Sequence, residues 1–214
     1  MKEAGMYFQE LIEAVSKGDA DAVVSLVKRG LDEGVEPQSI LDDGLLKAMG
    51  EIGEKFKNNE VFVPEVLIAA RALTAGTEIL KERMGAGGTN AIGKVVIATV
   101  AGDLHDIGKN LVKMMMEGVG LEVVDLGVDV TADKIIEAVK EHDADIVALS
   151  ALLTTTMAYQ RTVVEALKDA GLRDKVKVMI GGAPTTQAFC DDIGADGYTA
   201  DAPSAAEMAR DLVS

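Results

Sequence analysis

The pair Asp103 and His105 is the feature of this sequence that could hold a metal. A lone histidine is more often a hydrogen-bonded structural residue than a ligand. Here, however, Asp103 lies two positions earlier and could accept the hydrogen of one ring nitrogen, which fixes the tautomer and increases the basicity of the other. One histidine without neighbouring cysteines or histidines cannot build a zinc site. The metal would have to arrive with most of its ligands in place, as in a metal-containing macrocycle.

Three further segments could contact such a bulky ligand. Gly108 would let the loop pass close beneath it, and the pair Gly181-Gly182 would let the backbone approach a ligand tail without a Cβ clash. Ser150 and the threonines at 154–156 offer hydroxyls to an aromatic base. Taken alone, the glycine pair indicates a plain turn and the hydroxyls indicate a helix cap. Together with His105 they favour a ligand site.

The elements that must position these residues follow an alternating pattern. Short β-branched runs alternate with helical stretches, which predicts a parallel sheet covered by helices. The runs are 95–100, 122–126, 145–149 and 177–180, followed by a brief strand at 197–198 and a last helix from 203 to 213. Ligands of such sheets bind at the carboxyl ends of the strands, where the strand order reverses. In the order 2-1-3-4-5, the segments of His105 and Ser150 would flank that point.

The chain before residue 84 has a different period. Its apolar residues recur at helical spacing, which predicts an antiparallel bundle of four helices. We expect Gly30 to end the second helix, and Pro37 and Pro64 to lie in the first turns of the third and fourth. The expected fold class is α + α/β, an N-terminal four-helix bundle cap followed by a flavodoxin-like, doubly wound, five-stranded parallel sheet. The expected domains are 1–84 and 92–214, joined by a glycine-rich linker at 85–91.

Composition excludes several classes of function. With 21 basic and 36 acidic residues, the net charge of −15 repels nucleic acid. The single cysteine, Cys190, excludes an internal disulfide and a multi-cysteine metal cluster. No apolar run reaches the length of a membrane span and no signal peptide is recognisable, so we expect a cytoplasmic protein that binds no membrane.

The same motifs carry a family resemblance. Asp103-x-His105-x-x-Gly108, then 41 residues, Ser150-x-Leu152, then 28 residues and Gly181-Gly182, resembles the cobalamin-binding signature of the methionine synthase class. Upstream, the segments 49–56 and 61–67 look like the helical cap of corrinoid methyltransferase proteins. In length and layout the chain is most similar to the free-standing corrinoid proteins that serve in demethylation of methylamines, quaternary amines, methanol and methoxy compounds.

This resemblance implies a role for each site residue. His105 would be the lower axial ligand of cobalt, replacing the cofactor's dimethylbenzimidazole, which would enter a slot between the first and third strands. Asp103 would hold His105, and Thr156 would extend this relay where methionine synthase has a serine. The implied cofactor-binding residues are His105, Gly108, Ser150, Leu152, Thr154, Gly181 and Gly182.

The implied function is that of a methyl carrier. Cobalt, as Co(I), would accept a methyl group from a methylated donor through a substrate-specific methyltransferase, and a second methyltransferase would pass it to a folate or thiol acceptor. A reductive activase would restore molecules that drift to Co(II), and the bundle would cover the upper face of the corrin. The first choice of donor is a methylamine or a quaternary amine. The carrier is not expected to be catalytic alone.

Two alternatives share the cobalamin-binding motifs. An adenosylcobalamin-dependent mutase subunit would not need the helical cap, and its substrate barrel does not fit within 214 residues. A cobalamin-binding regulator would need a basic DNA-binding module, which is absent from this sequence. A flavodoxin-like domain without a corrin would leave His105 and Gly181-Gly182 unexplained.

Overall fold

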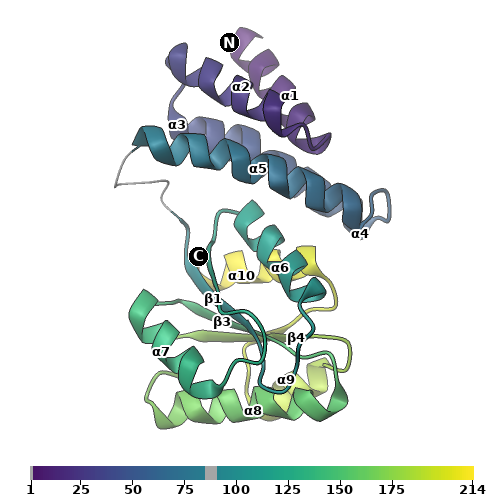
Figure 1. Ribbon diagram of the computed structural model, residues 1–214, viewed down its shortest axis with the longest axis vertical. Coiled ribbons are helices and arrows are strands. Elements are labelled where there is room, and N and C mark those ends of the chain that lie inside the picture. Colours follow the sequence, from purple (N-terminus) through teal and green to yellow (C-terminus); the bar gives the residue numbers. More distant parts are fainter. Residues whose placement is uncertain (1, 85–90) are drawn as a thin grey trace. The chain divides into compact units, whose positions relative to one another are not determined.

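The N-terminal part of the chain is helical, as its apolar periodicity predicts. The computed structural model describes residues 2–84 and 91–214, and the chain divides into two compact units, Met1–Asn90 and Ala91–Ser214. The first contains α1 (Lys2–Ser16), α2 (Ala20–Asp32), α3 (Pro37–Ser39), the π-helical segment η1 (Ile40–Leu46), α4 (Lys47–Lys57) and α5 (Val63–Met84). Because α3, η1 and α4 follow one another without a break, they form one helical stretch (Figure 1). Residues 2–84 therefore contain the four predicted helical stretches.

The prediction that Gly30 ends the second helix is wrong. α2 continues to Asp32, and Gly34, with a φ of 81°, supplies the left-handed turn after it. Gly30 is buried within the helix, where a Cβ would overlap the hydroxyl group of Tyr7. That hydroxyl donates a hydrogen bond to the carbonyl oxygen of Leu26, at 3.2 Å. Gly30 therefore allows α1 to pack closely on α2, and it does not end α2.

The second unit is a parallel sheet between two layers of helices. Its strands are β1 (Lys94–Thr99), β2 (Glu122–Asp125), β3 (Ile146–Ser150), β4 (Lys177–Gly181) and β5 (Gly197–Tyr198). Its helices are α6 (Ile107–Gly118), α7 (Ala132–His142), α8 (Thr154–Asp169), α9 (Gln187–Ile193) and α10 (Ala202–Leu212). The strand order β2-β1-β3-β4-β5, with every pair parallel, confirms the predicted topology.

The sheet is buried on both faces, which explains why its strands are runs of apolar residues without alternation. Figure 1 shows α6 and α10 over one face and α7 and α8 over the other. The pairing register places Thr99 at the end of β1 beside Ser150 of β3, and Ser150 beside Gly181 of β4. Three of the predicted ligand segments therefore begin at the same edge of the sheet.

The predicted linker falls mostly outside the residues that the structure describes, since 85–90 are not among them. The domain boundaries at 84 and 92 stay a prediction. Among the described residues, no helix combines the length and apolar character needed to cross a membrane.

Candidate functional site

The loop after β1 presents His105 at the carboxyl edge of the sheet. Its Nδ1 lies 2.7 Å from Oδ1 of Asp103, and its side chain is 52% exposed while that of Asp103 is fully buried. An ionised carboxylate can only accept, so Nδ1 carries a hydrogen, and in the neutral ring Nε2 keeps its lone pair. Within residues 2–84 and 91–214, Nε2 has no hydrogen-bond partner. Asp103 therefore orients the imidazole through Nδ1, and Nε2 on the other side of the ring is available to bind a ligand.

Asp103 is the centre of the hydrogen-bond network. Besides the ring of His105, Oδ1 accepts the backbone N–H of His105 at 3.1 Å. Oδ2 accepts the backbone N–H of Leu152 at 2.7 Å and the hydroxyl of Thr156 at 2.6 Å. Burial raises the pKa of Asp103, but the hydrogen bonds from Thr156, His105 and Leu152 outweigh it and hold the pKa well below its usual range. Asp103 is thus a permanently charged acceptor.

The carboxylate of Asp103 also lies at the N-terminus of α8. Leu153 is the N-cap residue of this helix and has no side-chain capping bond of its own. Its backbone N–H points to Oδ2 of Asp103 at 3.4 Å, next to that of Leu152. A negative charge at this position is favoured by the helix dipole and by the unpaired N–H groups of the first turn. Asp103 therefore joins the His105 loop to α8, some fifty residues later in the chain.

The hydroxyl-bearing residues divide into two groups. Thr156 is 8% exposed and contacts Asp103, as the predicted relay requires. Ser150 ends β3 beside Gly181, whereas Thr154 is exposed in the first turn of α8, and neither hydroxyl forms a hydrogen bond within the described residues. Leu152 is 42% exposed despite its apolar side chain. Ser150, Leu152 and Thr154 are therefore free to contact a ligand.

The three glycines differ in what a Cβ would meet. At Gly182, whose φ is 119°, a Cβ would overlap the carbonyl oxygen of Ala151, so packing of the β4 end against the β3 end requires glycine. At Gly108 and Gly181 a Cβ would meet nothing within 4 Å. Packing within the unit does not explain glycine at these two positions. Both leave room for a ligand to approach the backbone.

Two buried polar atoms near the glycine pair have no partner in the described structure. They are Oγ1 of Thr185, three residues after Gly182, and Oε1 of Gln160. Gln160 extends from α8, and its Nε2 donates to the carbonyl oxygens of Leu149 and Gly181, at 3.1 and 3.0 Å. It thereby ties the ends of β3 and β4 together. An unpaired buried acceptor or hydroxyl is costly and marks a place where a ligand group or water completes the site.

The sequence reasoning missed Gln160, although a signal was available. Thr156, Gln160, Val163 and Leu167 follow one another at helical spacing and form the buried face of α8. A glutamine on this face has to satisfy its amide inside the protein. Its position four residues after Thr156 could have placed it next to the strand ends.

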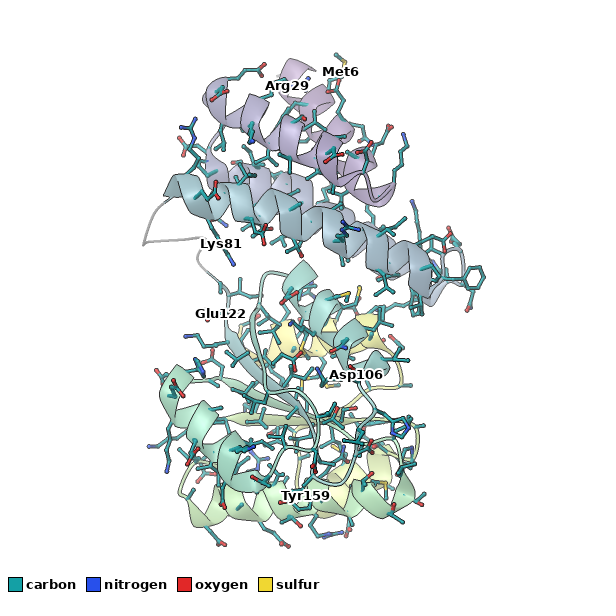
Figure 2. All side chains as sticks on the ribbon, in the orientation of Figure 1. Met6, Arg29, Lys81, Asp106, Glu122 and Tyr159 are labelled. Atoms are coloured by element: carbon teal, nitrogen blue, oxygen red, sulfur yellow. The ribbon has the colours of Figure 1, made fainter. Side chains whose placement is uncertain are left out.

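These features fit a cobalt corrinoid. No three side chains of His, Cys, Asp or Glu within 2–84 and 91–214 come together to hold a bare metal ion. His105 offers one nitrogen, which suits a metal that brings its other ligands. Leu104 and Ile107, on either side of His105, are 72% and 81% exposed, which is unusual for side chains of this size and suits an apolar ring above the loop. Asp106, labelled in Figure 2, completes this loop as the N-cap residue of α6.

The chain is similar to known proteins over nearly its whole length. Residues 7–81 and 93–207 each match a family model described as a B12 binding domain. A dimethylamine corrinoid protein of Methanosarcina barkeri is 45% identical over 206 residues, which is 96% of each chain. A chain of the methanol:cobalamin methyltransferase complex from Methanosarcina barkeri is 31% identical with a TM-score of 0.89, covering 97% of this chain and 80% of that one. A cobalamin-binding protein of Desulfitobacterium hafniense is 34% identical with a TM-score of 0.80, covering 97% and 98%.

Proposed function

Because this chain belongs to the family of B12-binding corrinoid proteins, whose cofactor is a cobalamin-type corrinoid, we propose that it carries methyl groups from a methylamine-specific methyltransferase to a second methyltransferase. When bound, the cobalt supplies a strong nucleophile that takes up a methyl group and releases it to a later acceptor. One observation supports this role above the others. His105, at the point where the strand order reverses, has Nδ1 held by a buried carboxylate and Nε2 without a partner.

In this proposal His105 would hold the cobalt through Nε2, and Asp103 would fix the orientation of the ring. The carboxylate of Asp103 also stabilises a positive charge on the imidazole, since the two groups are 2.7 Å apart. If Nε2 carried a proton instead of a metal, Asp103 with the Thr156 hydroxyl would hold the charged ring in place. Thr156 donates to Oδ2 of Asp103, so it would adjust how strongly the carboxylate stabilises a positive charge on the ring.

The remaining site residues hold the cofactor. We propose that Gly108 allows the corrin to approach the start of α6, and that Gly181 with Gly182 lines the nucleotide tail. Ser150, Leu152 and Thr154 meet the displaced base. The support is that Gly108 and Gly181 adjoin open space and that the hydroxyls of Ser150 and Thr154 are unpaired within the described residues.

The donor proposed first is dimethylamine. The support is similarity, because the relative that shares 45% of its residues over 96% of both chains is a dimethylamine corrinoid protein. The partners proposed are a methyltransferase for the amine, a second methyltransferase for a folate or thiol acceptor, and a reductive activase. The site offers no general acid besides His105 and its partners to activate an amine, so the first partner must supply that activation.

The carrier role is tested with purified components. Reduced holoprotein mixed with dimethylamine should keep its Co(I) absorbance, and adding the cognate amine methyltransferase should remove it. Rapid loss of the Co(I) spectrum without a partner would show a complete enzyme and contradict the carrier role.

The ligand assignment is tested by EPR of the Co(II) form. Labelling with ¹⁵N-histidine should change the nitrogen coupling, and His105→Ala should abolish it. The other histidine, His142 at the end of α7, is the matched control, and His142→Ala should leave the coupling unchanged. Coupling that persists in His105→Ala would exclude His105 as the ligand.

A further inference from the structure

The His105 loop is held from a side that the cobalamin-binding motifs do not include. The residues between β2 and α7 run alongside it, and Asp129 in this segment forms two hydrogen bonds with the loop. Its Oδ1 accepts the backbone N–H of Gly102 at 2.7 Å. Its own N–H donates to the carbonyl oxygen of Asp103 at 3.0 Å. Asp129 thus fixes the two peptide groups on either side of the Gly102–Asp103 bond.

The backbone conformation at this contact is unusual on both sides. Gly102 has a φ of 82°, and Asp129 has a φ of 53°, in the left-handed region that non-glycine residues seldom adopt. Aspartate tolerates this region better than most residues because its short polar side chain can form local hydrogen bonds. The conformation turns both the N–H and the carboxylate of Asp129 toward the His105 loop.

A second contact fixes the far side of the loop. The hydroxyl of Thr99, which is fully buried at the end of β1, donates to the carbonyl oxygen of His105 at 2.9 Å. Asp129 therefore holds the loop at the N–H of Gly102 and the carbonyl oxygen of Asp103. Thr99 holds it at the carbonyl oxygen of His105. Between these points the carboxylate of Asp103 is tied to α8. Together these contacts restrain the backbone that carries the imidazole.

We propose that Asp129 is a positioning residue for the axial histidine, and that its bond to Gly102 favours the metal-bound position of His105. This inference rests on the proposed role of His105 as the cobalt ligand. Without the carboxylate of Asp129, the peptide between Ala101 and Gly102 can rotate, since Gly102 itself imposes little restriction. His105 then moves away from the metal more often, while the residues that hold the nucleotide tail are unchanged.

The substitution Asp129→Gly separates the hydrogen bond from backbone strain. Glycine removes the carboxylate and adopts a positive φ readily, so backbone strain does not contribute to the effect. Asp129→Asn keeps a side-chain oxygen and also tolerates the left-handed region. Asp129 is exposed, so neither change creates a buried cavity. The matched control is Asp143→Gly, because Asp143 is also exposed and left-handed, with a φ of 51°, but caps the end of α7.

The experiment uses full-length proteins loaded with cobalamin and labelled with ¹⁵N-histidine. EPR of the Co(II) form gives the ratio of histidine-bound to histidine-free cobalt, and absorbance gives the total cobalamin bound. We expect Asp129→Gly to lower the ratio about fivefold, the effect of one lost hydrogen bond. Asp129→Asn and Asp143→Gly should match the wild type, and total cobalamin should stay the same in all four proteins.

An unchanged ratio in Asp129→Gly would overturn the inference, as would an equal fall in Asp143→Gly or the failure of Asn to restore the ratio. A fall in total cobalamin without a change in the ratio would also overturn it, because Asp129 would then act only on binding. If the wild type shows no histidine coupling, the proposed role of His105 fails and this inference fails with it. The wild-type spectrum therefore distinguishes the two failures.

Discussion

At the scale of single residues, sequence spacing predicts the contact between Asp103 and His105 but not the contacts made by residues farther along the chain. Asp103 and His105 are two positions apart, so their contact follows from local geometry. Thr156 lies 53 residues after Asp103, and only the motif resemblance connects them before the structure does. The contact of Asp129 with Gly102 spans 27 residues and belongs to no motif. Contacts made by loops from different strands depend on the register of the sheet, which residue types alone do not determine.

The relay is tested by Thr156→Val, which keeps the side-chain shape and deletes the hydroxyl. The buried carboxylate of Asp103 loses one donor, so we expect the free energy of unfolding to fall by about 1–2 kcal/mol. The Co(II)/Co(I) balance should shift more than cobalamin affinity. Urea unfolding and a redox titration measure the two effects. Thr155→Val, at an exposed neighbouring position, is the control and should change neither.

Asp103 should also produce a pH dependence of stability in the apoprotein. Its pKa is lowered on folding, so it stabilises the fold above the pKa of an unfolded aspartate, about 4, and this contribution is lost as the pH falls below that value. Asp103→Asn should be less stable at pH 7 but should lose less stability between pH 5 and pH 3. Urea unfolding at several pH values gives both curves. Parallel curves for the two proteins would show that Asp103 does not titrate with folding.

The two adjacent glycines should respond differently to alanine. Gly182→Ala places a Cβ against the carbonyl oxygen of Ala151 at a φ of 119°, so we expect a loss of several kcal/mol in apoprotein stability. Gly181→Ala adds a methyl to open space and should leave the apoprotein as stable as the wild type while weakening cobalamin binding. Thermal unfolding and a cobalamin titration separate the two. Equal cobalamin affinity in Gly181→Ala and wild type would remove Gly181 from the site.

At the scale of elements, periodicity predicts the helices and strands well and their ends less well. The strand order and the four helical stretches agree with the prediction, because apolar spacing reflects which faces are buried. Gly30 shows the limit of local rules. Glycine is favoured at helix ends, but here the ring of Tyr7, contributed by another helix, requires the absence of a side chain. The apolar spacing of Ile40–Leu46 likewise predicts a helix but does not distinguish a π-helical segment from an α-helix.

A buried ion pair joins two elements of the site. Lys109, in the first turn of α6, has a side chain that is 1% exposed, and its ammonium lies 2.6 Å from Oδ1 of Asp125 at the end of β2. Burial raises the pKa of Asp125, but the hydrogen bonds from Lys109 and the Gly127 N–H and the charges of Lys109 and Lys113 outweigh it, so the net shift is downward. The pair fixes the start of α6, directly after His105, to the sheet.

Removing one charge of this pair should be costly. We expect Lys109→Met to lower the free energy of unfolding by about 2–4 kcal/mol, since it leaves a partly buried carboxylate without its main partner. Lys113→Met is the control. Lys113 lies 3.6 Å from the other oxygen of Asp125 and is 32% exposed, so its loss should cost below about 1 kcal/mol. Urea unfolding measures the free energy of unfolding of both variants. Similar losses would show that the ion pair of Lys109 with Asp125 contributes no more than the more exposed pair of Lys113 with Asp125.

At the scale of the whole molecule, the motifs around His105, Ser150 and Gly181 all fall within the unit Ala91–Ser214. This unit has its own core between the sheet and α7, α8 and α9, which includes Ile135, Val163 and Ile193. A unit with its own core is expected to fold by itself. The fragment 91–214 should therefore unfold cooperatively in urea and bind cobalamin with His105 coordinated. A fragment that is unfolded without the first ninety residues would show that the bundle is needed for the fold.

One carboxylate of the site connects His105 to backbone amides that are distant in the sequence. Oδ2 of Asp103 accepts the backbone N–H of Leu152, while Oδ1 of the same carboxylate orients His105. Any movement of the histidine that pulls on Asp103 also loosens the first turn of α8. The amide hydrogens of Leu152 and Thr156 should then exchange with deuterium at rates that depend on whether the histidine is bound to cobalt. Hydrogen exchange at Leu152 and Thr156, which are 47 and 51 residues after His105, would then report whether His105 is bound to cobalt without any spectroscopic probe on the cofactor.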